Sequence, residues 1–151
     1  MIEGDEMLDK RIDRLLRGGP FLRLIDHQFA DLRAKYDLKK VDLRILYYLS
    51  NNSDHDTARE IQEYFNMNKG YISQTADRLQ KRGYLVIVPD TNDHRIAHYV
   101  VTEESAELIH SINEMWMHTK CQILQGLTSD EYEAFCYAVN KIEENIENML
   151  K

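Results

Sequence analysis

A cluster of polar side chains occupies residues 68–78, at the positions left over by an apolar helical repeat. If Ile72, Ala76 and Leu79 pack inward, the first turn and the outer face of this helix remain free to form hydrogen bonds. Side chains at the start of a helix can reach base edges when that helix enters the major groove of DNA. The candidate DNA-contacting residues of this segment are Asn68, Lys69, Gly70, Tyr71, Ser73, Gln74 and Arg78.

The residue types divide these candidates by the contact that each can make. Lys69 can donate to guanine O6 and N7, and Gln74 can pair with adenine, so both are candidate base readers. Ser73 and Arg78 suit contacts to phosphate oxygens. Tyr71 can pack on a thymine methyl or bond a phosphate, whereas Gly70 lets the backbone come close to the groove. The alternative is an ordinary amphipathic helix with a solvated face.

A second candidate contact lies about 20 residues further on, where Asp93 precedes Arg95 by two positions. A narrow minor groove concentrates negative potential and attracts an inserted guanidinium. Asp93 could hold Arg95 in position through a bidentate pair. The alternative is a surface ion pair of little energetic consequence. His94 and His98 could add positive charge at low pH, although solvation of a loop explains them equally well.

Four possible metal ligands recur at helical spacing in the C-terminal third: Glu107, His110, Glu114 and His118. Imidazole and carboxylate groups on one helical face would suit zinc or another divalent ion. The opposite face carries apolar residues, among them Leu108 and Ile112, so the solvated side of an amphipathic helix explains the stripe more simply. We therefore expect no metal site, and a metal-responsive protein remains an alternative.

The elements that would position these residues begin with a helix-turn-helix. Thr57 and Glu60 have the spacing of a capping box, which starts a helix. The helix that follows carries Ala58, Ile61, Tyr64 and Phe65 on one face. A tight connection at 66–68 follows, and Asn68 can cap the next helix, which Gly83 ends. Two short helices joined by about three residues are typical of a helix-turn-helix.

Strand periodicity replaces helical periodicity after Gly83. Residues 84–88 and 95–101 predict two strands, and the segment 89–93 between them has the composition of a turn. The expected product is a two-stranded wing next to the helix-turn-helix.

The remaining residues predict long terminal helices. Residues 8–35 have apolar positions at helical spacing, which Gly18-Gly19-Pro20 interrupts, and residues 42–50 predict a further helix. Thr102 can cap a helix that runs to about residue 125, and residues 128–131 open the last one. The two terminal regions carry apolar seams: Leu8, Ile12 and Leu15, and Phe135, Val139, Ile142, Ile146 and Met149. Because one small lobe cannot cover both seams, we expect an obligate homodimer.

These patterns predict a mainly α fold with a two-stranded β-wing, built as a winged helix-turn-helix domain plus terminal dimerisation helices. The expected division is a dimerisation helix region over 1–40, a DNA-binding domain over 41–101 and C-terminal helices completing the dimerisation region over 102–151.

The charge distribution agrees with DNA binding in the middle segment, although the net charge is −7. Residues 57–101 carry six basic and five acidic side chains, whereas residues 102–151 carry three and ten. An acidic C-terminal third could confine DNA to the middle segment. No stretch approaches the roughly 18 apolar residues of a membrane span, and the acidic N-terminus does not resemble a signal peptide, so we expect a cytoplasmic protein. Cys121 and Cys136 favour packing roles.

Three segments resemble the MarR family of transcriptional regulators. Asn68–Leu85 is similar to the family's recognition helix and first wing strand, Asp90, Asp93 and Arg95 match its acidic wing turn, and residues 101–104 match the entry to its fifth helix. Val101 and Ser105 depart from the pattern, where leucine and glycine are more common. The resemblance implies a ligand-responsive repressor that binds an inverted-repeat operator as a homodimer, with a small, often aromatic effector.

Two other function classes compete with this interpretation. The first is a winged-helix module that binds another protein. The second is an enzyme, but we find no nucleophile elbow, phosphate-binding loop, dinucleotide-binding glycine pattern or H-E-x-x-H motif. We therefore expect no catalytic residue and no cofactor.

Overall fold

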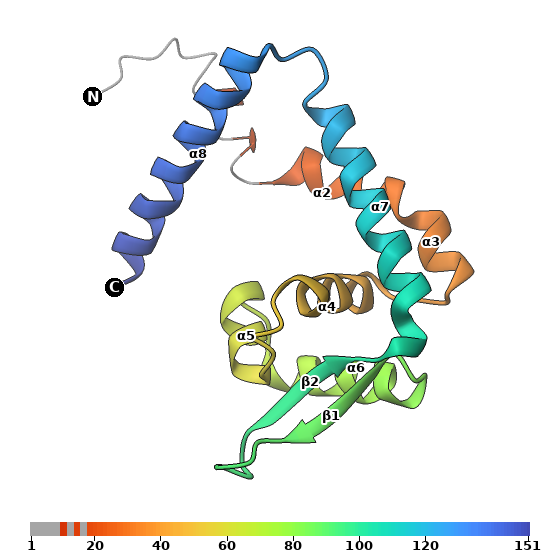
Figure 1. The fold of residues 1–151 in the computed structure, drawn as a ribbon. Coiled ribbons are helices and arrows are strands. Elements are labelled where there is room, and N and C mark those ends of the chain that lie inside the picture. The colour runs from red at the N-terminus through yellow and green to blue at the C-terminus, as the bar shows by residue number, and fades with distance from the viewer. Residues whose placement is uncertain (1–9, 12–13, 16–17) are drawn as a thin grey trace. The chain divides into compact units, whose positions relative to one another are not determined.

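The computed structural model describes residues 10–11, 14–15 and 18–151, and the chain divides into two compact units, Met1–Trp116 and Met117–Lys151. The elements are mainly helices with one two-stranded antiparallel sheet, as predicted (Figure 1). In chain order they are α2 (Gly19–Gln28), α3 (Ala30–Lys35), α4 (Lys40–Asn51), α5 (Ala58–Phe65), α6 (Lys69–Lys81), β1 (Leu85–Pro89), β2 (Ala97–Val101), the 3-10 helix η1 (Glu103–Ser105), α7 (Ala106–Ile123) and α8 (Ser129–Leu150).

The predicted interruption of the N-terminal helical region is confirmed at Gly18. This residue has φ 70°, a left-handed conformation that glycine adopts at little cost, and Pro20 lies in the first turn of α2. Leu15, one of the predicted seam residues, is exposed. The other two, Leu8 and Ile12, lie outside the described residues.

Helix α4 supplies the centre of the core in the first unit. Its Ile45 and Leu46 are fully buried, and Ile61 of α5, Ile72, Ala76 and Leu79 of α6 pack into the same cluster. The cluster continues into β1 through Leu85, into β2 through Tyr99 and into α7 through Leu108 and Ile112. The inward face predicted for α6 is therefore confirmed. Burial of these side chains fixes which face of α6 remains exposed.

Local capping fixes both ends of the helix-turn-helix. The Thr57 hydroxyl accepts from the Glu60 amide at 3.3 Å, and the Glu60 carboxylate accepts from the Thr57 amide at 3.0 Å. Asn68 caps α6 by accepting from the Gly70 amide. Gly83, with φ 77°, follows the end of α6. These three predictions are confirmed, but Tyr64 is not on the buried face of α5, since it is 67% exposed.

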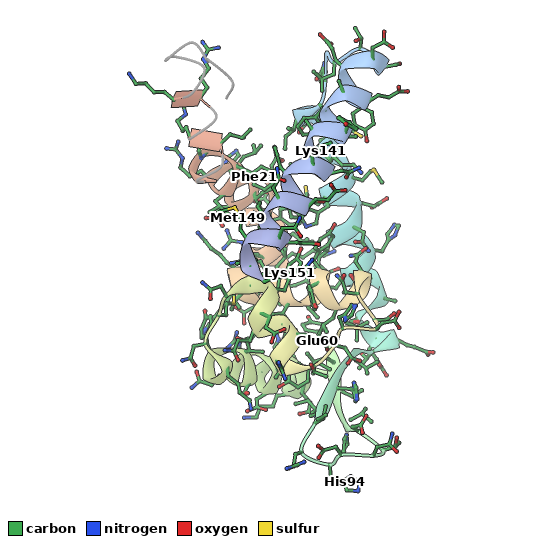
Figure 2. The ribbon with its side chains drawn as sticks, turned by 90° about the vertical axis from the view of Figure 1, so that its left-hand side faces the viewer. Phe21, Glu60, His94, Lys141, Met149 and Lys151 are labelled. Carbon is green, nitrogen blue, oxygen red and sulfur yellow. The ribbon has the colours of Figure 1, made fainter. Side chains whose placement is uncertain are left out.

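The wing is a β1–β2 hairpin in which Leu85 pairs with Val101 and Ile87 with Tyr99 (Figure 1). Strand β2 begins at Ala97 rather than at residue 95, because side-chain and backbone hydrogen bonds close the turn first. The Asp90 carboxylate accepts from the amides of Asn92 and Asp93, and the Ile96 amide donates to the Asp93 carbonyl. Arg95 therefore belongs to the turn. His94 lies at the far tip of the hairpin (Figure 2).

Thr102 occupies the N-cap position of η1, as predicted, but its side chain makes no capping hydrogen bond. Its hydroxyl donates instead to the Gly83 carbonyl at 2.5 Å, and the helical segment begins with η1 before α7. In the second unit, Gly126 turns the chain with φ 91°, and the predicted start of the last helix at residues 128–131 is confirmed, with Thr128 and Glu131 forming a capping box of α8. In the single chain Cys121 is exposed and Cys136 is half-buried. Within the described ranges, no helix is both long and apolar enough to cross a membrane.

Candidate nucleic-acid interface

The first turn of α6 is built around the cap that Asn68 supplies. The Asn68 side-chain oxygen lies 2.8 Å from the Gly70 nitrogen, and a Cβ at Gly70 would come within 3.1 Å of that oxygen. Glycine at this position therefore leaves room for the cap. The cap orients the start of α6, where the side chains of Lys69 and Tyr71 are exposed, and Gln74 is exposed one turn later. Ser73 is half-buried.

Arg78 does not point outward, as the helical pattern predicts, but pairs with a carboxylate in the core. Its guanidinium contacts Asp42 of α4, whose side chain is 1% exposed, and lies 3.4 Å from the Thr75 hydroxyl. Asp42 also accepts from the Lys39 amide at 2.7 Å, which fixes the first turn of α4. The guanidinium thus joins α6 to α4, and the Arg78 side chain is 29% exposed.

Arg82, directly after α6, also anchors the C-terminal end of this helix. No sequence pattern predicted this role. Arg82 donates to the backbone carbonyls of Tyr36 and Asp37, in the loop between α3 and α4, and stacks on the ring of Tyr84. Asp37 has φ 47°, a left-handed conformation that is uncommon for residues other than glycine. Arg78 and Arg82, four positions apart, anchor α6 to the domain. Their acceptors are distant in sequence, so no local pattern could have revealed them.

The predicted pair at the wing turn is confirmed. Asp93 accepts from Arg95 Nε at 2.9 Å and from Arg95 Nη2 at 3.0 Å, and its carboxylate also accepts from the Arg95 amide at 3.0 Å. The Arg95 guanidinium beside it holds the pKa of Asp93 below its ordinary value. The Arg95 side chain remains 90% exposed. The turn therefore presents an oriented guanidinium to the solvent, as a minor-groove contact requires.

His98 has a definite place at the base of the wing, where the sequence predicted either a positive charge at low pH or a solvated loop residue. Its Nδ1 lies 2.5 Å from Asp56 Oδ1, and its Nε2 lies 3.1 Å from Asp90 Oδ2. These hydrogen bonds, Asp56 first, raise the pKa of His98. The alternation of β2 places His98 on one face, but only the tertiary structure brings Asp56 to it.

In the glutamate and histidine stripe of α7, Glu107, His110 and Glu114 form separate pairs with their neighbours. His110 and Glu114 are 3.3 Å apart and both are mostly exposed, while Glu107 accepts from the Tyr36 hydroxyl at 3.0 Å and pairs with Lys35. In the part of the chain that the structure describes, no three histidine, cysteine or acidic side chains come together in a group that could hold a metal ion. The stripe is the solvated side of α7, opposite Leu108 and Ile112.

Helix-turn-helix, wing and terminal helices together define the winged helix-turn-helix class. Residues 36–96, which include α4 to α6, β1 and the wing turn, match the model of the MarR family.

Solved structures of this family share the fold. One is a MarR family transcriptional regulator from Listeria monocytogenes complexed with a 26-mer DNA, with 19% identity, a TM-score of 0.75 and 89% of either chain covered. Another is a MarR protein from Peptoclostridium difficile, with 19% identity and a TM-score of 0.73, over 99% of this chain and 93% of that one. The reduced form of MarR from E. coli has 20% identity and a TM-score of 0.65, over 86% of this chain and 94% of that one.

Proposed function

We propose that this protein is a sequence-specific, double-stranded DNA-binding transcriptional regulator. The observation that carries the proposal is the pairing of two exposed cationic elements on one winged helix-turn-helix: the first turn of α6, with Lys69, and the wing turn, with Arg95 held by Asp93. A helix in the major groove and a wing arginine in the minor groove would read one half-site together. The DNA complex of the Listeria monocytogenes relative supports this function.

The proposed active form is a homodimer. Helix α8 has no buried residue among its 22, and Phe135, Ile142, Ile146 and Met149 are all at least 45% exposed. These residues and the half-buried Val139 repeat at a spacing of four and three, which is the seam of a helix that packs on another helix. Met149 lies near the end of this helix (Figure 2). A second copy of the chain would cover the seam symmetrically.

The proposed regulation is release of DNA by a small ligand. A cavity of about 220 Å³ in the first unit is lined by four apolar side chains, three cationic side chains and one carboxylate. The apolar lining residues are Leu22, Ile25, Phe29 and Leu43, and the charged ones are Asp26, Arg33, Lys40 and Arg44. Apolar walls with a few charged groups are typical of small-molecule sites. The excess of cations favours an anionic aromatic effector, and the protein would act as a repressor.

The test of the function is selection of bound sequences from random double-stranded DNA, followed by footprinting. We expect an inverted repeat whose half-sites lie about 10 bp apart, because a two-fold dimer presents its two α6 helices one turn of DNA apart. Protection of a single asymmetric half-site at saturation would contradict the dimeric mode. Selection that enriches no sequence would favour the alternative, a winged-helix module that binds protein.

The test of regulation uses calorimetry with salicylate as the probe, a small anionic aromatic compound. If the probe weakens DNA binding, DNA must weaken probe binding by the same factor, because linkage between two sites is reciprocal. Leu22→Glu, which places a negative charge in the lining of the cavity at a position that is 56% exposed, should abolish the probe's effect while leaving DNA binding intact. Unequal factors, or an unchanged effect in this variant, would show that the probe acts elsewhere.

A further inference from the structure

His98 lies between two carboxylates that belong to different segments. Asp56 is in the connection between α4 and α5, and Asp90 directly follows β1. The distances are 2.5 Å from Nδ1 to Asp56 and 3.1 Å from Nε2 to Asp90. The backbone joins the same segments, since the Tyr99 amide donates to the Asp56 carbonyl at 3.0 Å and Thr57 forms a β-bridge with His98. The ring therefore spans from the body of the domain to the start of the wing turn.

This arrangement selects the doubly protonated ring. A neutral imidazole carries one N–H, so it can donate to only one of the two carboxylates, and its other nitrogen would face the second carboxylate with a lone pair. The imidazolium donates to both. Asp56 and Asp90 are the charged groups that face the ring, and both favour its positive form. In agreement with the geometry, the pKa of His98 is raised above its ordinary value of 6.5.

Hydrogen bonds continue from His98 to the candidate DNA contact. Asp90 uses one oxygen for His98 and the other for the amides of Asn92 and Asp93, at 2.7 and 2.8 Å. Asp93 in turn holds the guanidinium and the amide of Arg95. A movement of Asp90 would therefore displace the segment that presents Arg95.

We propose that His98 is a positioning residue: its protonated ring ties the wing turn to the body of the domain and so fixes the place from which Arg95 reaches DNA. The consequence for DNA binding rests on the proposed function. Because folding of the wing raises the pKa of His98, the stabilising contribution is fully present below the ordinary pKa of 6.5 and is lost as pH rises through the raised pKa. As pH rises through the raised pKa of His98, the wing turn should become less ordered and DNA affinity should decrease.

The experiment has two readouts on the full chain. NMR without DNA follows the His98 ring and the amides of Asn92 and Asp93 from about pH 5.5 to about pH 9, a range that spans histidine titration. Operator affinity is measured over the same range. In the wild type, the NMR signals of the His98 ring, those of the two amides and the operator affinity should all change with the same midpoint, at a pH above 6.5. The affinity loss should be about 2- to 10-fold per half-site, the cost of ordering a side chain that the free protein no longer holds.

Two variants and two controls separate positioning from general charge. His98→Gln and Asp90→Asn should both remove the pH dependence of the wing amides and of operator affinity. Asp90→Asn keeps the histidine, so it provides the test if His98→Gln folds poorly. His94→Gln removes a histidine from the same turn, and His55→Gln removes one that pairs with Glu60. Both controls should keep the wild-type midpoint.

The outcomes distinguish this inference from the proposed function. If the wing amides do not follow the His98 ring, the positioning role is wrong, whatever the DNA does. If amides and ring titrate together while operator affinity stays constant, the positioning role stands and the wing contact to DNA is wrong.

Discussion

The carboxylate of Asp42 and the guanidinium of Arg78 form an ion pair across 36 positions of sequence and join α4 to α6. Asp42 is 1% exposed, whereas the Arg78 side chain is 29% exposed. The pair holds the last turn of α6, while the side chains of its first turn, Lys69 and Tyr71, are exposed. The orientation of α6, the candidate recognition helix, therefore depends on a residue of another helix, Asp42 of α4.

We expect Arg78→Ala to lower the free energy of unfolding by about 3 kcal/mol, because it leaves the buried Asp42 charge without its partner. Urea unfolding measures the change. Arg59→Ala removes an exposed pair with Glu63 and should have no measurable effect, so it serves as the matched control. The double variant with Asp42→Ala should lose less than the sum of the single changes, since no unpaired charge remains. Additive losses would contradict coupling through this pair.

Arg95→Ala should weaken operator binding most on DNA with A·T-rich flanks and reduce its salt dependence. The reason is that a narrow minor groove attracts the guanidinium that Asp93 orients. Gel-shift titrations on the operator and on a flank-swapped copy give the comparison. Since the side chain is exposed, the melting temperature should not change. Equal losses of affinity on both DNAs would show that Arg95 contacts only phosphate.

Lys69→Ala should weaken operator binding in a different way from Arg95→Ala, because Lys69 lies at the start of α6 and can donate to guanine in the major groove. We expect a loss on the order of 1–3 kcal/mol per half-site and relaxed discrimination at one base pair. The measurement compares the operator with a copy in which that guanine is replaced. If the variant loses the same factor on both, the lysine contacts phosphate only.

Ile142→Glu should convert the dimer to a monomer, since it places a charge at the centre of the exposed α8 seam. Analytical ultracentrifugation should then give 17.9 kDa, against twice that mass for the wild type. Glu144→Lys changes a charge on the opposite helical face and should leave the dimer intact. A monomeric wild type that still binds the operator at full affinity would defeat the dimer proposal.

The carboxyl group of Asp90 should titrate near pH 2, because the Asp93 amide, His98 and the Asn92 amide, in that order of importance, hold its pKa at about 2. A depressed pKa stabilises the folded form above the ordinary value of 3.8, and this contribution is lost as pH falls through about 2. Carboxyl carbon chemical shifts measure the titration. A midpoint at 3.8 would mean that the wing turn is open in solution.

The sequence alone determined the features that depend on near neighbours. The caps at Thr57, Asn68 and Thr128 involve groups two or three residues apart, and Asp93 holds an arginine two residues away. Apolar spacing likewise identified the inward face of α6. These features follow from backbone geometry within one turn, so residue type and spacing suffice to predict them.

Only the tertiary structure decided the partners of long or charged side chains. Helical spacing predicted that Arg78 points outward, but its flexible stem lets the guanidinium reach Asp42 on another helix. His98 meets Asp56 from 42 positions away, and Arg82 finds carbonyls 45 and 46 positions away. Periodicity gives the direction in which a side chain leaves its helix or strand. Which group it meets depends on how separate elements pack, because an ion pair or hydrogen bond forms only where folding brings donor and acceptor together.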